Sequence, residues 1–307
     1  MGQNSPLMSK YLLNICGPTA VGKTGVALYW AEKLGCPILS TDSRQCYSEL
    51  AIGSAPPSQE ELDRVPHYFV GDRSIQDPIT AGEFETFALQ TLEKLFQTHD
   101  VVVAVGGSGM YIDALLHGLD PLPTDPKIKA ELENRASTEG LAALKTELYH
   151  LDPEHAAKVD VRNPRRVIRA LEVIAITGKK YSDQLNNTPK ERPFTIVNWV
   201  LNMDREKLYE RINSRVELMI SAGLEEEARK LEPHQELVAL QTVGYREWWP
   251  YFEGLYNRDR TVELIQQFSR RYAKRQLTYF KRFENALWLD PNDINSQEES
   301  LRKAGVL

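Results

Sequence analysis

The stretch that most constrains the fold runs from an apolar strand through a glycine-containing turn into a helix. Tyr11–Cys16 is typical of a short buried strand, and from Lys23 onward apolar residues recur at helical spacing until Gly35. The turn between them fits the pattern of a glycine, four residues and then Gly-Lys-Thr. Its residues are Gly17, Pro18, Thr19, Ala20, Val21, Gly22, Lys23 and Thr24. Glycines let the backbone amides turn inward, and the helix N-terminus adds its positive dipole end, so the segment predicts a phosphate-binding loop.

Two side chains in this loop add to the prediction. Lys23 supplies a point charge for a phosphate, and the Thr24 hydroxyl can hold Mg²⁺. The alternative is a glycine-rich turn between strand and helix that binds nothing. The pattern indicates phosphate but does not specify ATP.

The bulk properties are those of a cytoplasmic globular protein. The chain has 307 residues, 42% of them hydrophobic, and a net charge of −6. No apolar run is long enough for a membrane span, and Met1–Lys10 lacks the apolar centre of a signal peptide. Cys16, Cys36 and Cys46 form neither a paired framework nor a CxxC motif, which favours a reducing compartment. An acidic balance does not exclude a nucleic-acid partner, because local patches matter more than the sum.

Further strands predict an α/β fold with a mainly parallel sheet. The expected strands are 37–41, 101–105, 194–201 and 286–289, with a less certain one at 67–70. In such a sheet, ligands bind at the carboxyl ends of the strands. This places Asp42, which follows the second strand, beside the phosphate loop as a candidate base. The alternative is that Asp42 caps the following turn.

The strand at 101–105 ends in a second tight turn, Gly106 to Tyr111. A protein that hydrolyses ATP would be expected to carry an acid at the end of such a strand. Asp100 lies at the opposite end, which weakens the ATPase interpretation.

Two stretches are rich in arginine and lysine. Residues 120–126 are proline-rich and suggest a domain boundary, and 127–192 are predicted to be helical. Within them, Arg162 to Arg169 holds four arginines, which favours either a phosphate-backbone contact or a solvated face. The last long helix has six basic residues and no acid over 270–282, interleaved with aromatics, a pattern typical of a nucleic-acid face.

A single amphipathic helix is expected over 205–230, with Arg211 and Arg215 one turn apart where they could reach one anion. Exposed arginines are the alternative. Residues 243–249 are aromatic-rich, and core packing is their default interpretation.

Taken together, these segments resemble the tRNA dimethylallyltransferases (isopentenyl pyrophosphate:tRNA transferases) of the bacterial type, over roughly residues 11–290. The motifs that carry the resemblance occur in one order: Gly17–Thr24, Asp42-Ser43-Arg44-Gln45 with Tyr47, Ile52-Gly53, Gly106 to Tyr111, Leu122-Pro123, Asn163 to Glu172, Val243-Gly244-Tyr245 and Lys274-Arg275-Gln276. The loop's fifth position is Val21 where serine is common, and Ser108-Gly109-Met110 replaces the commoner Thr-Gly-Leu. Residues 53–56 lack the lysine that is usual after Ile-Gly-Thr-Ala.

The resemblance implies an activity, a cofactor and partners. The family transfers a dimethylallyl group from dimethylallyl pyrophosphate to the exocyclic amine of the adenosine at position 37, directly 3′ of the anticodon. The tRNAs are those that read codons starting with U, and the product is i6A. The reaction needs Mg²⁺. The implied fold is a P-loop kinase-like core, 1–122 and 194–307, with an inserted all-helical domain, 123–193, that grips the anticodon stem-loop. We expect a monomer with no membrane partner.

The resemblance also assigns site residues by position. Pyrophosphate would bind at Gly17 to Thr24, Mg²⁺ at Thr24, and the catalytic residues would be Asp42 as base and Arg215 on the pyrophosphate. The implied tRNA contacts are Asp42, Ser43, Arg44, Gln45, Ser108, Lys129, Arg165, Arg166, Val167, Ile168 and Arg169.

Two other enzymes share parts of this pattern. A small-molecule P-loop kinase would need the same loop and an Asp after the second strand, but not the basic segments or the insertion. Adenylate isopentenyltransferase, which prenylates free AMP, ADP or ATP, would share the core without an anticodon-gripping insertion. A non-catalytic RNA-binding protein is the third alternative, and intact Lys23, Thr24 and Asp42 disfavour it.

Overall fold

The computed structural model describes residues 10–186 and 188–307. The prediction that Met1–Lys10 is not a signal peptide therefore concerns residues outside the described ones, apart from Lys10. The chain forms two compact units: the residues up to His117 together with Glu191–Leu307, and Gly118–Lys190. No described helix is both long enough and apolar enough to cross a bilayer.

The first unit is built on a six-stranded sheet in which every pairing is parallel. The strand order is β3-β2-β4-β1-β5-β6. The strands are β1 (Tyr11–Cys16), β2 (Ile38–Ser40), β3 (His67–Tyr68), β4 (Val101–Gly106), β5 (Thr195–Leu201) and β6 (Leu287–Leu289). Because β2, β4 and β1 are neighbours, the loops that follow them leave the same edge of the sheet side by side. The predicted α/β class and parallel sheet are confirmed.

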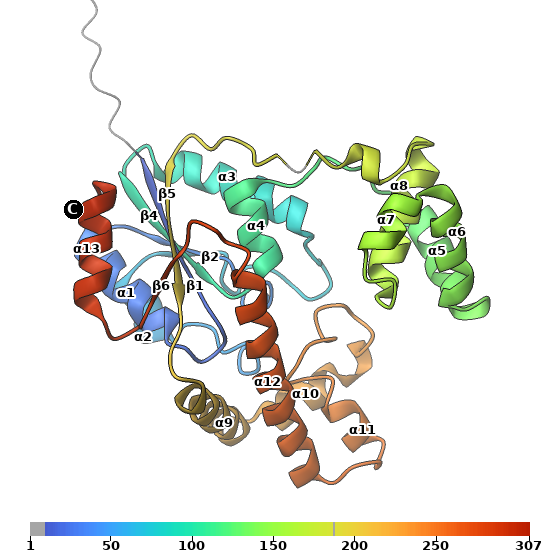
Figure 1. The fold of residues 1–307 in the computed structure, drawn as a ribbon. Helices are drawn as coiled ribbons and strands as arrows, with labels where there is room; N and C mark the ends of the chain where they lie inside the picture. Colours follow the sequence, from blue (N-terminus) through green and yellow to red (C-terminus); the bar gives the residue numbers. More distant parts are fainter. Residues whose placement is uncertain (1–9, 187) are drawn as a thin grey trace, which may run out of the picture. The chain divides into compact units, whose positions relative to one another are not determined.

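Helices cover both faces of this sheet (Figure 1). Side chains alternate along a strand, so Leu13 and Ile15 of β1 pack on the face covered by α1 and α13, and Leu12 on the face covered by α3 and α4. The helices of this unit are α1 (Lys23–Leu34), α2 (Gln59–Arg64), α3 (Ala81–Leu95), α4 (Gly109–His117), α9 (Arg205–Ser221), α10 (Leu224–Leu231), the 3₁₀ turn η2 (Glu232–His234), α11 (Trp248–Phe252), α12 (Arg258–Phe280) and α13 (Ile294–Ala304).

The second unit has helices and no strand among its described residues, 118–186 and 188–190. Its elements are α5 (Pro126–Thr138), α6 (Leu141–Leu151), α7 (Pro153–Lys158), α8 (Pro164–Thr177) and the 3₁₀ turn η1 (Ser182–Gln184). Leu144, Leu148 and Val167 are fully buried in a separate core. The unit begins at Gly118, earlier than the expected 123, because the proline-rich segment is hydrogen-bonded to α8.

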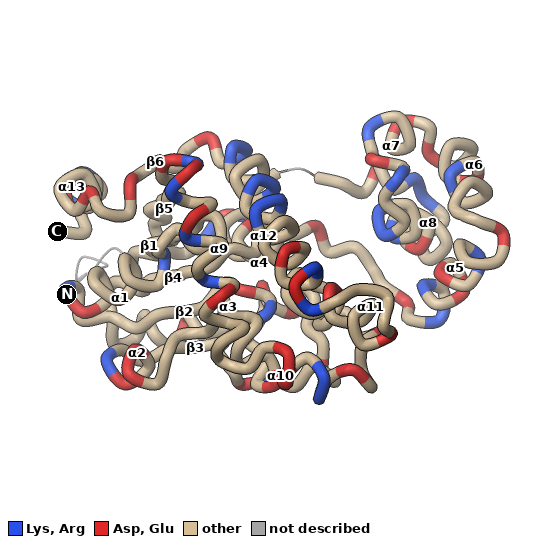
Figure 2. Tube along the Cα trace, turned by 90° about the horizontal axis from the view of Figure 1, so that it is seen from below, with Lys and Arg blue, Asp and Glu red and all other residues tan. Residues whose placement is uncertain are grey.

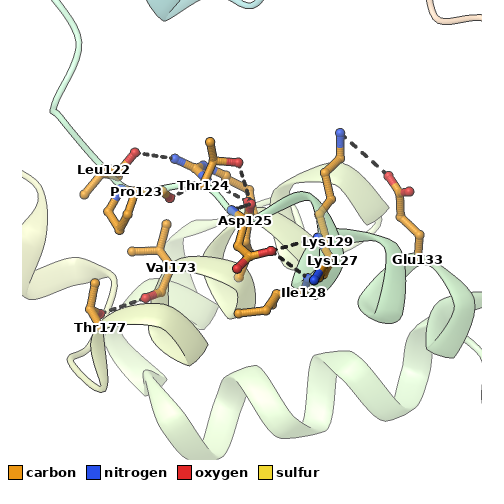
Figure 3. Close-up of polar contacts among 12 residues, drawn as sticks. Leu122, Pro123, Thr124, Asp125, Lys127, Ile128, Lys129, Glu133, Val173 and Thr177 are labelled. Atoms are coloured by element: carbon orange, nitrogen blue, oxygen red, sulfur yellow. Dashed lines mark hydrogen bonds and ion pairs between the residues drawn. The ribbon is translucent and has the colours of Figure 1, made fainter.

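Figure 3 shows how the proline-rich segment is held. The buried carboxylate of Glu172 accepts hydrogen bonds from the Thr124 hydroxyl at 2.6 Å and the Asp125 amide at 2.9 Å. Arg169 donates to the carbonyls of Leu122 and Pro123, at 3.0 and 2.9 Å. The four residues before α5, Leu122 to Asp125, are therefore fixed by the ion-paired side chain of Arg169 and the carboxylate of Glu172 on α8.

Three predicted elements have different bounds in the structure. The helix expected over 205–230 is two helices, because Gly223 adopts a left-handed φ of 99° between α9 and α10. The strand at 67–70 is limited to His67–Tyr68, since Phe69 has a positive φ of 67°. The basic helix ends at Phe280, so the last two basic residues of 270–282 lie beyond it.

Candidate active site

The phosphate loop connects β1 to α1 with the backbone that its glycines predict. Gly22 has a φ of 106°, a left-handed conformation that suits glycine. A Cβ on Gly17 would lie 2.6 Å from the carbonyl oxygen of Leu201 on β5, so no larger residue fits there. No side chain caps the N-terminus of α1, although a serine or asparagine often does so elsewhere. The loop geometry is that of an anion site.

Lys23 is the charged centre of the loop. Its ammonium donates a hydrogen bond of 2.9 Å to the carbonyl oxygen of Pro18, inside the loop. Burial and then the positive charge of Arg215 lower the pKa of Lys23 to about 8, while Asp42 acts in the opposite direction. Two half-buried positive groups and one carboxylate therefore lie close enough to act on one another, and a phosphate would stabilise both cations.

One cleft of about 300 Å³ joins the loop to the turn after β2 and to α9. Its polar wall comprises Thr19, Gly22, Lys23, Thr24, Asp42, Arg44, Gln45, Arg211 and Arg215. Its apolar and aromatic wall includes Val216, Met219, Val243, Tyr245, Ile265 and Tyr272. A charged end and an apolar end in one cleft suit a ligand that joins a phosphate group to a hydrocarbon.

Asp42 caps the following turn and also lines the cleft; its role as a base stays a prediction. Its Oδ1 accepts hydrogen bonds from the amides of Arg44 at 2.9 Å and Gln45 at 3.3 Å, as a turn cap does. The same side chain lines the cleft beside Lys23 and Arg215. Capping fixes the orientation of the carboxylate, and orientation is what a general base needs.

The rest of the turn is held by local hydrogen bonds. The Ser108 hydroxyl accepts from the Ser43 amide at 2.8 Å, so the turns after β2 and β4 are in contact. The side-chain Nε2 of Gln45 donates to the carbonyl oxygen of Ala55 at 2.9 Å. Arg44 donates to its neighbour Ser43 at 2.9 Å. The structure thus brings together Asp42 to Gln45 and Ser108, five of the predicted tRNA contacts.

The two arginines of α9 differ in exposure. Arg215 is half-buried, lies 3.4 Å from the carbonyl oxygen of Ala55, and its pKa is lowered by burial. Arg211 is exposed, and its Nη2 is 3.4 Å from where a Cβ of Gly22 would be. Both side chains line the cleft.

The other predicted tRNA contacts lie in the helical unit and differ among themselves. Lys129, 3.9 Å from Glu133, is exposed, as are Arg165 and Arg166. Val167 and Ile168 belong to the core of that unit, 0% and 7% exposed, so their side chains do not face solvent. Arg169 pairs with Glu172 at 2.6 Å and holds the proline-rich segment. The prediction that these three side chains contact tRNA is not supported by their surroundings.

The basic face of α12, together with the residue Arg282 just beyond the helix, forms a shallow groove, called the α12 groove below. Its residues are Arg271, Lys274, Arg275, Thr278, Tyr279 and Arg282. Figure 2 shows the blue segments gathered along this helix. Arg282 lies over the Tyr279 ring at 4.8 Å, and Arg275 over Tyr272 at 5.7 Å. Arg270 instead donates to Asn213 of α9, so it turns away from this face. The groove adjoins the cleft, because Arg275 of the groove lies over the ring of Tyr272, which lines the cleft.

Sequence reasoning missed two polar groups of the site. Glu227 of α10 accepts hydrogen bonds from the amides of Ile52 at 2.8 Å and Gly53 at 3.0 Å, and from the Tyr245 hydroxyl at 2.6 Å. Gln276 lies within the basic stretch 270–282 and was given no role of its own, but it is buried and lines the cleft. Its spacing of three residues from Ala273 and four from Phe280, which places it on the same helix face as these apolar residues, was the available signal.

The fold and the cleft define a P-loop protein of the kinase-like α/β class, with the phosphate loop after the central strand β1. The chain belongs to the IPP transferase family, whose sequence model matches residues 45–283.

Similar proteins support that membership. A protein named tRNA dimethylallyltransferase from Cytophaga hutchinsonii is 45% identical over 94% of this chain and 95% of its own length. One named tRNA dimethylallyltransferase 1 from Bacteroides fragilis is 47% identical over 93% and 95%. Among solved structures, the full-length tRNA isopentenylpyrophosphate transferase of Bacillus halodurans has a TM-score of 0.71 at 33% identity, over 97% of this chain and 96% of that one. A eukaryotic dimethylallyltransferase solved while acting on tRNA shares the fold, with a TM-score of 0.77 at 22% identity, over 97% of this chain and 78% of that one.

Proposed function

We propose that this protein transfers a dimethylallyl group from dimethylallyl pyrophosphate to the exocyclic amine of the adenosine at position 37 of tRNA. The acceptors are tRNAs that read codons starting with U, and the product is i6A. The observation that carries this proposal is the single cleft in which Lys23, Asp42 and Arg215 meet beside an apolar wall. The named activity of the relatives described above supports it.

The cleft supplies what this reaction needs. An adenine amine is a poor nucleophile because its lone pair is delocalised into the ring, so a positioned base must take its proton as the new bond forms. Asp42 is that base. Negative charge grows on the leaving pyrophosphate, where the loop amides, Lys23 and Arg215 stabilise it. The bond from carbon to pyrophosphate oxygen breaks as the bond from carbon to nitrogen forms.

The residues present fit a magnesium ion held mainly by substrate. Mg²⁺ prefers oxygen ligands, keeps several waters and is often bound through phosphates with one or two protein oxygens. The Thr24 hydroxyl and the Asp42 carboxylate are oxygen donors in the same cleft as the loop. We infer that Thr24 would hold the ion, which would neutralise charge on the pyrophosphate. The described residues contain no group of three His, Cys, Asp or Glu poised for a metal, and a site of this kind does not need one.

The acceptor adenine must leave its stack in the RNA to reach the cleft. This unstacking costs a few kcal/mol, which protein contacts to the RNA phosphate backbone offset. The α12 groove, with basic side chains over aromatic rings beside the cleft, suits an RNA strand. Arg165, Arg166 and Lys129 are exposed candidates in the helical unit. A monomeric, cytoplasmic enzyme stays a prediction from the sequence.

The test is transfer of labelled dimethylallyl pyrophosphate to an unmodified anticodon stem-loop with three consecutive adenosines at and after the third anticodon base. Mg²⁺ is present, ATP is omitted, and AMP serves as a parallel acceptor. Label on the RNA alone is the expected result. Label on AMP would indicate adenylate isopentenyltransferase activity instead. Label on neither acceptor would contradict prenyl transfer and favour the small-molecule kinase hypothesis.

We predict that removing both Arg165 and Arg166 weakens RNA binding and flattens its salt dependence. Each lost phosphate contact should reduce the slope of log K against log salt by about 0.7–0.9. The measurement is stem-loop affinity over a salt series. Lys179→Ala with Lys180→Ala removes the same charge from exposed positions of the same unit and is the control. Equal slopes for the two double variants would contradict a specific role for the arginines.

Arg169→Ala is expected to act differently, by destabilising the helical unit. The substitution removes the ion partner of buried Glu172 and the donor to two carbonyls, a loss of about 1–3 kcal/mol. A thermal unfolding scan would show a lower midpoint. An unchanged midpoint with weaker RNA binding would assign Arg169 to RNA after all.

A further inference from the structure

Gln276 is a polar side chain on the buried face of α12. It is 6% exposed, between Ala273 and Phe280, which are both 0% exposed. A buried amide is expected to have hydrogen-bond partners, because leaving it unpaired is costly. The identity of those partners shows what the side chain holds together.

Both ends of the Gln276 amide are bonded, and to different loops. Its Oε1 accepts from the backbone amide of Thr19 in the phosphate loop at 2.9 Å. Its Nε2 donates to the carbonyl oxygen of Gly107, in the turn after β4, also at 2.9 Å. The two loops leave adjacent strands, because Cys16 of β1 pairs with Gly106 of β4. A Cβ on Gly107 would lie 2.4 Å from Nε2, so only glycine permits this approach.

The turn after β4 is also hydrogen-bonded to the segment that carries Asp42. Ser108 accepts a hydrogen bond from the Ser43 amide, and the amide of Thr41 donates to Val105 at 2.7 Å. The Gln276 amide therefore connects the phosphate loop directly to the turn after β4, and through Ser108 it is linked to the turn that bears the candidate base.

We propose that Gln276 is a positioning residue that sets the separation between the bound pyrophosphate and Asp42. This inference rests on the proposed function. A misplacement of about 1 Å between reacting groups can lower a rate roughly 10²-fold without removing any contact to substrate. The backbone amide of Thr19 donates to Gln276. When that hydrogen bond is lost, the Thr19 amide is free to donate to phosphate. The effect therefore falls on the chemical step and not on pyrophosphate affinity.

The test compares Gln276→Met, which keeps the length and loses both hydrogen bonds, with a matched control. Gln297 of α13 is 0% exposed, accepts from Trp30 Nε1 at 2.7 Å and donates to the carbonyls of Asp290 at 3.1 Å and Pro291 at 3.2 Å. It does not line the cleft. Gln297→Met thus removes the same kind of buried amide outside the lining of the cleft. The measurements are the single-turnover rate of prenyl transfer to the stem-loop, the Kd of inorganic pyrophosphate and the thermal midpoint.

Gln276→Met is expected to slow the single turnover by roughly 10- to 10²-fold, with the pyrophosphate Kd within about threefold of wild type. Gln297→Met is expected to lower the midpoint and leave the rate within about twofold. A normal rate for Gln276→Met, a rate loss matched by a loss of pyrophosphate affinity, or equal rate losses in both variants would overturn the proposal.

Gln276→Asn, one methylene shorter but still an amide, provides the same rate comparison if the methionine variant does not fold. It cannot reach both loops at once, so the same slow turnover is expected and a wild-type rate would overturn the proposal. Wild-type enzyme is run alongside. Absence of transfer by wild type would contradict the proposed function and this inference with it, whereas active wild type with a normal Gln276 variant contradicts the inference alone.

Discussion

Asp42→Asn is expected to lower the single-turnover rate of prenyl transfer by roughly 10²–10⁴-fold, the usual span for a general base. Asparagine keeps an oxygen that can accept the hydrogen bonds from the amides of Arg44 and Gln45, so the turn stays capped. It cannot take a proton from the acceptor amine. The substitution therefore separates the turn cap that the structure shows from the base role that we propose.

Asp42→Ala removes the cap as well and is the companion variant. It should show the same rate loss and, in addition, a lower thermal midpoint, because a lost cap costs about 1 kcal/mol. Affinity for the stem-loop should change much less than the rate in both variants. Near wild-type turnover by Asp42→Asn would eliminate the base assignment and leave Asp42 as a turn cap.

Arg215→Ala is expected to have the second largest effect, roughly 10²–10³-fold on the single-turnover rate, the span for loss of one group that stabilises developing charge. Arg215 is half-buried beside Lys23, and burial lowers its pKa. A charged group in such a position is poorly solvated, so an anionic leaving group stabilises it strongly. The measurement is the rate at saturating RNA with varied dimethylallyl pyrophosphate.

Arg211→Ala is the matched control for this variant. Arg211 lies one turn earlier on α9 and lines the same cleft, but it is exposed. Water screens its charge, so its removal should lower the rate by less than about tenfold. The reverse order of the two effects would assign the pyrophosphate contact to Arg211.

The local parts of the fold were predictable because they depend on neighbours in the chain. The strand Tyr11–Cys16, the phosphate loop and the helix from Lys23 were expected with their observed bounds, since the glycines and the change of periodicity specify them. The single helix expected over 205–230 was wrong, because Gly223 is left-handed and separates α9 from α10, while the apolar pattern continues across it.

In the basic segments, the sequence could not distinguish arginines that are available to a ligand from arginines that are bonded within the protein. Arg165 and Arg169 look alike in the sequence, yet the first is exposed and the second is bonded to Glu172 and to two carbonyls. Arg270 and Arg271 are adjacent, yet the first is bonded to Asn213 and the second lines the α12 groove. Helix phase and the partner element decide which charge remains available to a ligand.

The phosphate loop, the parallel α/β class and the family resemblance could be predicted from the sequence, because each follows from short motifs whose residues act through their own backbone. The folded chain was needed to show that Asp42 and Arg215 share one cleft, that Glu227 holds the loop at Ile52 and Gly53, and that Gln276 joins two loops. These contacts link positions up to 257 residues apart. Such pairs are set by the order of the strands and the packing of α9, α10 and α12 around their carboxyl ends, which no local pattern encodes.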